Sequence, residues 1–317
     1  MASLVGVDLG SVSVDCAVIA KKGKVIELKE YFSFKKEGVG EDKTTDIMKL
    51  IGEFDSRKLN SSKASISIPD KNFLLISFKL PKLPPKEKDI AIRAEIEQKL
   101  PFPLEEAAFD VIRLNPKEVS ENDYVAFCTR LSDVTRYHGL ASNYNLVPER
   151  ALTETIANLN CAEFNGYMTQ KEISYLLVDI GAMHVGFTLV TNGLPWLTFC
   201  LAPKDTFNAE EGVEFDSKKF LEEQMSDIGK IISSFEEKSV VAAIRKVLLF
   251  GKTELLDYCQ EKIAALTPLN IERVDPLKNI EIAPEIKEKV NLSLVSSVAI
   301  GLALSGTDSG GIGSVTR

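Results

Sequence analysis

The stretch VGVDLGSVSV, residues 5–14, decides how the fold is interpreted. An apolar run ends at Asp8, Gly10 and Ser11 interrupt it, and alternating apolar residues resume at Val12. This pattern predicts two antiparallel strands joined by a tight turn. The turn KKGK at 21–24 then leads into a third strand-like stretch at 25–34. The N-terminal region therefore predicts a meander of three strands.

The same pattern returns in SYLLVDIGAMHVGFTLVTNGLPWLTFCLA, residues 174–202. Gly181 interrupts an apolar run just after Asp179 and Ile180, and a second turn follows at Asn192 and Gly193. Asn-Gly favours the positive φ angles of a two-residue hairpin. The chain therefore carries an internal structural repeat.

Helical and strand periodicity outline the remaining elements. In the first half we expect a helix at 44–54, strands at 64–69 and 73–80, a helix at 87–100, and paired strands at 104–114 and 123–130. Prolines at 84–85 precede the helix at 87–100, and prolines at 101 and 103 end it. In the second half we expect a helix at 217–235, a strand at 246–250, a helix at 254–263 and a packed helix at 293–304. The Gly- and Ser-rich tail at 305–317 is expected to be disordered.

Composition excludes several classes of protein. The 317 residues are 44% hydrophobic, enough for a large core and about two domains. The formal net charge of −8 argues against binding to nucleic acid, which relies on clustered Lys and Arg. No secretory signal is expected at the N-terminus, and the longest apolar runs fall short of the ~20 residues of a membrane span. We therefore expect a cytoplasmic chain without direct membrane insertion.

Cysteine and histidine do not indicate a metal centre. The five cysteines are widely spaced and form no CxxC pair, so reduced and mostly buried thiols are expected. His138 and His184 are the only histidines, and neither lies beside a plausible set of ligands in the sequence. No transition metal is predicted.

The two glycine turns carry the candidate binding chemistry. Glycine allows backbone N–H groups to approach a phosphate closely, and a neighbouring hydroxyl adds a donor. Asp8, Gly10, Ser11 and Ser13 fit this use in the first turn. Asp8 would hold Mg²⁺ through water, because Mg²⁺ keeps much of its hydration shell. A plain β-turn would explain one such hairpin by itself.

The second turn offers Asp179 and Gly181 in the equivalent places, with Asp179 as a second residue for Mg²⁺. This duplicated meander, followed later by a strand, Gly251 and a helix, resembles the superfamily of actin, Hsp70 chaperones and sugar kinases. The resemblance implies an α/β fold of the actin-like ATPase (RNase H-like) type with two domains. It also implies ATP and Mg²⁺ as possible cofactors, with Gly251 and Lys252 on the adenosine side.

Several stretches resemble the PilM family of type IV pilus assembly proteins and the related cytoplasmic domain of type II secretion GspL. They are VGVDLGSVSV (5–14), AIRAEIEQKLPFPLEEAAFDVI (91–112), LLVDIGAMHVGFTLVTNGLPWLTF (176–199), RVDPLKNIEI (273–282) and VSSVAIGLAL (295–304). The resemblance implies a first domain over 1–171 with a small inserted subdomain at about 60–140. It implies a second domain over 172–304.

The chain departs from the family pattern at its predicted phosphate sites. Asp15 stands where the family usually has Lys, and the stretch CLAPKDTF at 200–207 lacks the usual Gly-Gly pair. Only Gly251 remains of a glycine run, followed by Lys252. A lysine at a helix start is more often exposed to solvent, and the alternative is that Lys252 supplies a compensating charge to a phosphate. His184 takes the place of a small hydroxyl residue. These changes leave nucleotide binding open, and no residue is nominated to activate water, so at most slow ATP hydrolysis is expected.

The resemblance implies a scaffold that binds the cytoplasmic tail of a PilN-like inner-membrane protein. Through that partner the chain would lie at the inner membrane. In the family the tail lies between the first subdomain and the inserted one, which points to residues 60–110. Two alternatives share the same turns: a phosphotransferase of the sugar-kinase or acetate-kinase kind, and a nucleotide-dependent filament-forming actin homologue.

Overall fold

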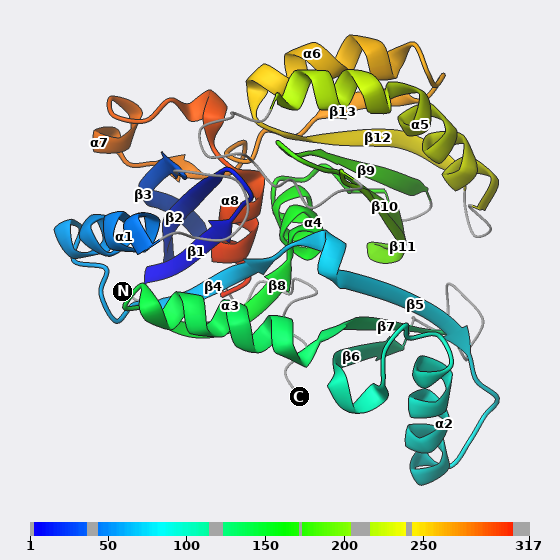
Figure 1. Ribbon diagram of the computed structural model, residues 1–317. Helices are drawn as coiled ribbons and strands as arrows, with labels where there is room; N and C mark the ends of the chain where they lie inside the picture. Colours follow the sequence, from blue (N-terminus) through cyan, green and yellow to red (C-terminus); the bar gives the residue numbers. More distant parts are fainter. Residues whose placement is uncertain are drawn as a thin grey trace.

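The computed structural model describes residues 3–36, 44–113, 123–170, 173–203, 216–238 and 243–306. The tail from residue 307 and the end of the 200–207 stretch lie outside these ranges, so the predictions made for them stay predictions. The described chain forms two large sheets with helices between and around them, and a small third sheet at one end (Figure 1).

The first meander opens a six-stranded sheet of order β14-β3-β2-β1-β4-β8. Adjacent strands of the meander are antiparallel, and β4, β8 and β14 pair parallel to β1, β4 and β3. Gly23, in the turn between the second and third strands, has a φ of 65°, which glycine adopts without steric cost. The predicted meander is therefore confirmed. The strands are β1 (Ser3–Leu9), β2 (Ser13–Lys22), β3 (Val25–Lys35), β4 (Lys63–Ile68), β8 (Val147–Thr153) and β14 (Glu281–Ile282).

The second meander forms a five-stranded sheet of order β11-β10-β9-β12-β13. Asn192 and Gly193 both have positive φ, 55° and 76°, as the hairpin prediction required. β12 pairs parallel to β9 just as β4 pairs parallel to β1, so the internal repeat extends to a fourth strand. The strands are β9 (Ser174–Ile180), β10 (Val185–Thr191), β11 (Leu194–Leu201), β12 (Ile244–Gly251) and β13 (Asn270–Arg273).

Helices cover the outer faces of both sheets and fill the space between them (Figure 1). The apolar sides of α1 (Thr44–Ser56) and α3 (Leu131–Asn143) pack on the first sheet, and those of α5 (Ser217–Lys238) and α6 (Thr253–Ala264) pack on the second. α4 (Glu154–Phe164) and α8 (Ser297–Leu304) share a core with strands of both sheets. The contact between α4 and α8 therefore joins the two halves.

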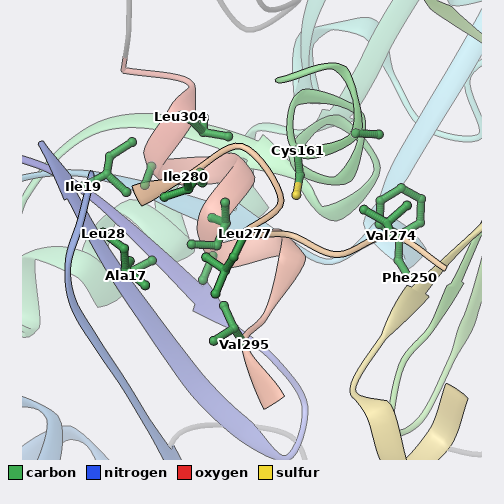
Figure 2. Packing of buried hydrophobic residues seen from close by; sticks show 14 of the residues in the cluster. Ala17, Ile19, Leu28, Cys161, Phe250, Val274, Leu277, Ile280, Val295 and Leu304 are labelled. Carbon is green, nitrogen blue, oxygen red and sulfur yellow. The ribbon is translucent and has the colours of Figure 1, made fainter. Parts of the chain in front are cut away.

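The segment between β13 and β14 crosses from the second sheet back to the first. Leu277 and Ile280 on this segment lie in one buried core with residues of α8, Leu28 of β3 and Cys161 of α4 (Figure 2). The segment continues through α7 (Pro284–Lys287) and the 3-10 turn η3 (Leu292–Leu294) to α8. The C-terminal part of the described chain thus completes the core of the first half.

The small third sheet has the order β5-β7-β6 and is antiparallel throughout. One face packs on α2, which begins at Pro85 and ends before the prolines at 101 and 103, as expected. Its elements are η1 (Asp70–Asn72), β5 (Phe73–Lys79), α2 (Pro85–Glu97), η2 (Leu104–Glu106), β6 (Ala107–Arg113) and β7 (Asp123–Arg130).

Two predicted boundaries differ from this arrangement. The insertion is narrower than 60–140, because β4 belongs to the first sheet and α3 packs on it. The prediction of a second domain over 172–304 is wrong at its end, because β14 pairs with β3 and α8 packs against the first sheet. The second domain was predicted as one continuous range because sequence patterns carry no signal that a chain returns to its first sheet.

Candidate functional site

The two glycine turns open into one cleft of about 110 Å³, together with the end of β12 and the N-terminal ends of α4 and α8. Every residue nominated from the sequence lines it: Asp8, Gly10, Ser11, Ser13, Asp179, Gly181, Gly251 and Lys252. The fold therefore brings together residues separated by more than 240 positions. It adds further polar residues to the same cleft: Asp15, Glu154, His184, Ser296 and Ser297.

Asp8 is the penultimate residue of β1 and is buried. Its Oδ2 accepts a hydrogen bond of 3.0 Å from Ser296 Oγ, whereas its buried Oδ1 has no hydrogen-bond partner in the described part of the chain. Burial, reinforced by the charge of Asp15, raises the pKa of Asp8 to about 7. Such a carboxyl group is poised either to keep a proton or to take up a cation.

Asp15, on β2 opposite Asp8, accepts three hydrogen bonds. The donors are Ser13 Oγ at 2.9 Å, Tyr31 Oη at 2.7 Å and Lys252 Nζ at 3.2 Å. The carboxyl side chain is only 2% exposed. The negative charge expected at this position is therefore neutralised from across the cleft.

Lys252 reaches Asp15 because of the glycine before it. Gly251 ends β12 with a φ of 140°, and a Cβ there would stand 2.7 Å from the carbonyl oxygen of Ile180. Only glycine is compatible with this backbone. Lys252 then caps the start of α6 and extends its ammonium group to Ser13 Oγ, at 3.1 Å, as well as to Asp15.

The second turn is closed by a bond of 3.0 Å from the Gly181 amide to the carbonyl oxygen of His184. The imidazole of His184 lies over Gly181, where an added Cβ would be 2.3 Å from its Cε1. Asp179 Oδ2 accepts a hydrogen bond of 2.9 Å from Asn158 Nδ2 on α4. The backbone concavity expected at this turn is thus occupied by the ring of His184.

His184 lies among carboxyl groups. Its Nε2 is 3.7 Å from Glu154 Oε2 and from Asp179 Oδ2, an ion-pair distance rather than that of a hydrogen bond. Burial by itself would lower the pKa of His184, but Glu154 and Asp179 outweigh it and raise that pKa to about 10. Burial also raises the pKa of Glu154 to about 8, against the opposing charge of His184. The group of side chains therefore holds extra protons at neutral pH.

Asp70 connects this group to the base of the small sheet. Its side chain accepts bonds from the Thr155 amide at 3.0 Å and from Thr155 Oγ1 at 2.7 Å, and its own amide donates to Glu154 Oε2 at 3.0 Å. Thr155 Oγ1 also lies 3.1 Å from Thr188 Oγ1 on β10. Burial raises the pKa of Asp70 to about 6. One polar network thus joins α4, the second sheet and the inserted sheet.

Sequence reasoning did not nominate Glu154 or Asp70. Glu154 follows the N-cap residue Thr153, whose Oγ1 accepts the Ile156 amide, a pattern that indicates a helix start and nothing more. Asp70 follows a proline between two strands and reads as a turn residue. Their place beside His184 depends entirely on tertiary packing. Among the described residues, no cluster of three or more His, Cys, Asp or Glu side chains has an arrangement suited to a metal ion.

Two repeated meanders around a shared cleft, with a strand, a glycine and a helix on its far side, define an actin-like ATPase fold. A chain in a solved PilM–PilN type IV pilus biogenesis complex matches with a TM-score of 0.72 and 20% identity, over 96% of this chain and 98% of that one. The cytoplasmic domain of EpsL from Vibrio cholerae, an inner-membrane component of type II secretion, matches at 0.53 and 10% identity over 96% of both chains. A Bacteroides thetaiotaomicron protein with an actin-like ATPase fold and unknown function matches at 0.50 and 10% identity over 92% and 95%.

The family model of the type IV pilus assembly protein PilM matches residues 6–195. This is more than half of the 317 residues, so the chain belongs to the PilM family, as its sequence stretches indicated. A search of curated proteins gave no match. In the described ranges, none of the helices has the length and apolar character needed to cross a membrane.

Proposed function

We propose that the chain is a pilus-assembly scaffold that binds the cytoplasmic segment of a PilN-like inner-membrane protein and is held at the membrane through it. Family membership and the fold shared with the chain of the PilM–PilN complex support the proposal. The observation that carries it is the face of the small sheet opposite α2. This face would receive the segment.

That face carries apolar side chains beside polar ones such as Ser77 and Asp110, and it is only partly covered. Leu75 on β5, Phe127 on β7 and Ile112 on β6 alternate with the residues that pack on α2, and each is partly exposed. Leu131 directly follows β7 as the first residue of α3 and is 50% exposed. Apolar side chains on a sheet face can receive the side chains of a bound peptide, and main-chain hydrogen bonds to that peptide would come from the edge strands β5 or β6. Binding of this kind needs no catalytic group.

The test is a titration of the purified chain with a fluorescent peptide that has the sequence of a PilN cytoplasmic segment, followed by anisotropy. Leu131→Glu should weaken binding by roughly 10- to 100-fold, because a buried leucine contributes ~1.5–3 kcal/mol. Ile90→Glu is the matched control, since Ile90 is 70% exposed on α2 and lies on the far side of that helix from the sheet. Loss of binding in the Ile90 variant alone would contradict the proposed face, and no binding by the unchanged protein would contradict the partner.

A further inference from the structure

The cleft is too small for the nucleotide that the fold class implies. Its volume of about 110 Å³ falls below the ~300–1,000 Å³ usual for small-molecule sites. Four carboxyl groups line it, those of Asp8, Asp15, Glu154 and Asp179, against two basic side chains. A triphosphate would enter a space that is both narrow and acidic.

One hydroxyl expected to bind phosphate, that of Ser13, is already used within the chain. Ser13 Oγ donates to Asp15 Oδ2 at 2.9 Å and accepts from Lys252 Nζ at 3.1 Å. The second turn is filled by the ring of His184, which stands where a Cβ on Gly181 would be. Side chains of the protein itself therefore fill the space over Gly181 and engage the Ser13 hydroxyl of the first turn.

His184 and Lys252 also do what bound ligands would do in this cleft. His184 supplies the positive charge that a metal ion would bring, and Lys252 bridges the two halves as a nucleotide would. His184 sits 3.7 Å from both Glu154 and Asp179, so its ring supplies positive charge between two carboxyl groups. Lys252, from the second half, forms its ion pair with Asp15 of the first half. Asp15 is held for that contact by Tyr31, whose hydroxyl also accepts the Ser296 amide at 3.0 Å. The pair thus joins β12 and α6 to β2, β3 and the start of α8.

We propose that this cleft is an internal lock: Lys252–Asp15 and His184–Glu154–Asp179 hold the two halves together in place of a bound nucleotide and metal ion. The halves then keep one relative position whether or not ATP is present. The inference goes beyond peptide binding and does not depend on it. It also gives one structural explanation for the three residues at which the chain departs from the family pattern, Asp15, His184 and Lys252.

The test compares thermal unfolding and amide hydrogen exchange of the full chain with and without millimolar Mg-ATP. The unchanged protein should show the same Tm and the same exchange in both conditions, because no site is open to the nucleotide. A ligand that binds only the folded state raises Tm progressively as its concentration exceeds its Kd. A rise in the Tm of the unchanged protein that grows with the concentration of Mg-ATP would therefore overturn the proposal.

Lys252→Met breaks the lock from one side. It should lower Tm by several degrees and speed exchange at both 10–15 and 251–255, because a buried carboxylate loses its partner. Asp15→Asn added to Lys252→Met should recover part of the loss, and Lys252→Arg, which keeps the ion pair, should behave like the unchanged protein.

Lys246→Met is the matched control. Lys246 pairs with Glu272 at 2.7 Å inside the second sheet, so its loss should leave exchange at 10–15 unchanged. If Lys252→Met left Tm and exchange at 10–15 unaltered, the lock would be refuted. The same conclusion would follow if Lys246→Met accelerated that exchange equally.

Discussion

Gly301→Ala should destabilise the protein more than a single added methyl group ordinarily would. Gly301 lies in α8, and a Cβ there would stand 1.8 Å from the carbonyl oxygen of Ala157 on α4. Reaching the 3.4 Å of ordinary van der Waals contact requires the two helix backbones to separate. Gly6 of β1 prevents α8 from retreating, because its own Cβ position is 2.1 Å from the Ala299 carbonyl oxygen.

The expected cost follows from this confinement. Overpacking in a core costs about 1–3 kcal/mol, and the upper end applies here because the obstacles are backbone atoms rather than flexible side chains. With an unfolding entropy of about 2.1 cal/mol/K per residue, a loss of about 3 kcal/mol lowers Tm by about 4–5 °C. The shift of α8 would also move Ser296 away from Asp8, whose Oδ2 it now contacts at 3.0 Å.

Thermal unfolding followed by circular dichroism measures the effect, with Gly52→Ala as the matched control. Gly52 is also helical, in α1, but nothing lies within 4 Å of its Cβ position. Replacing it should raise stability by about 0.5–1 kcal/mol through helix propensity alone. The change in Tm should therefore be negative for Gly301→Ala and positive for Gly52→Ala. A Tm for Gly301→Ala equal to or above that of the unchanged protein would refute the packing argument.

Three further measurements test other parts of the structure. Folding raises the pKa values of Asp70, Glu154 and His184, so the native state binds more protons than the unfolded state. The free energy of unfolding should therefore fall as the pH rises from about 5 to about 9. A denaturant midpoint that rises over that range would contradict this. Ser296→Ala removes the acceptor of the Ala299 amide at the start of α8 and the donor to Asp8, and should cost about 1–2 kcal/mol in urea unfolding. Burial raises the pKa of the Cys200 thiol to about 12, so a thiol reagent should react slowly with the native protein and with all five free cysteines only after denaturation; a fast phase of one thiol would disprove this.

The sequence by itself determined the features that rest on local rules. Hairpins were predicted where a strand pattern meets an obligatory turn residue, as at Asn192-Gly193, and Gly251 was identified at the end of a strand where its positive φ is indeed required. The helix beginning at Pro85 was bounded by prolines, which restrict the backbone whatever surrounds them. Both turns follow strands of one repeat, and the structure places the residues beside them around one cleft.

The tertiary structure decided the features that depend on contacts between distant segments. α4 was not predicted, because residues along nearly its whole length are buried, including Asn158 and Asn160, and a helix enclosed on all sides shows no apolar stripe. The return of α8 to the first sheet, and the meeting of Glu154 and Asp70 with His184, join residues far apart in the chain. A local sequence pattern indicates the conformation of a segment. Which segments become neighbours depends on how surfaces far apart in the chain fit together. Only the folded structure therefore shows that side chains of the protein itself lie in the cleft.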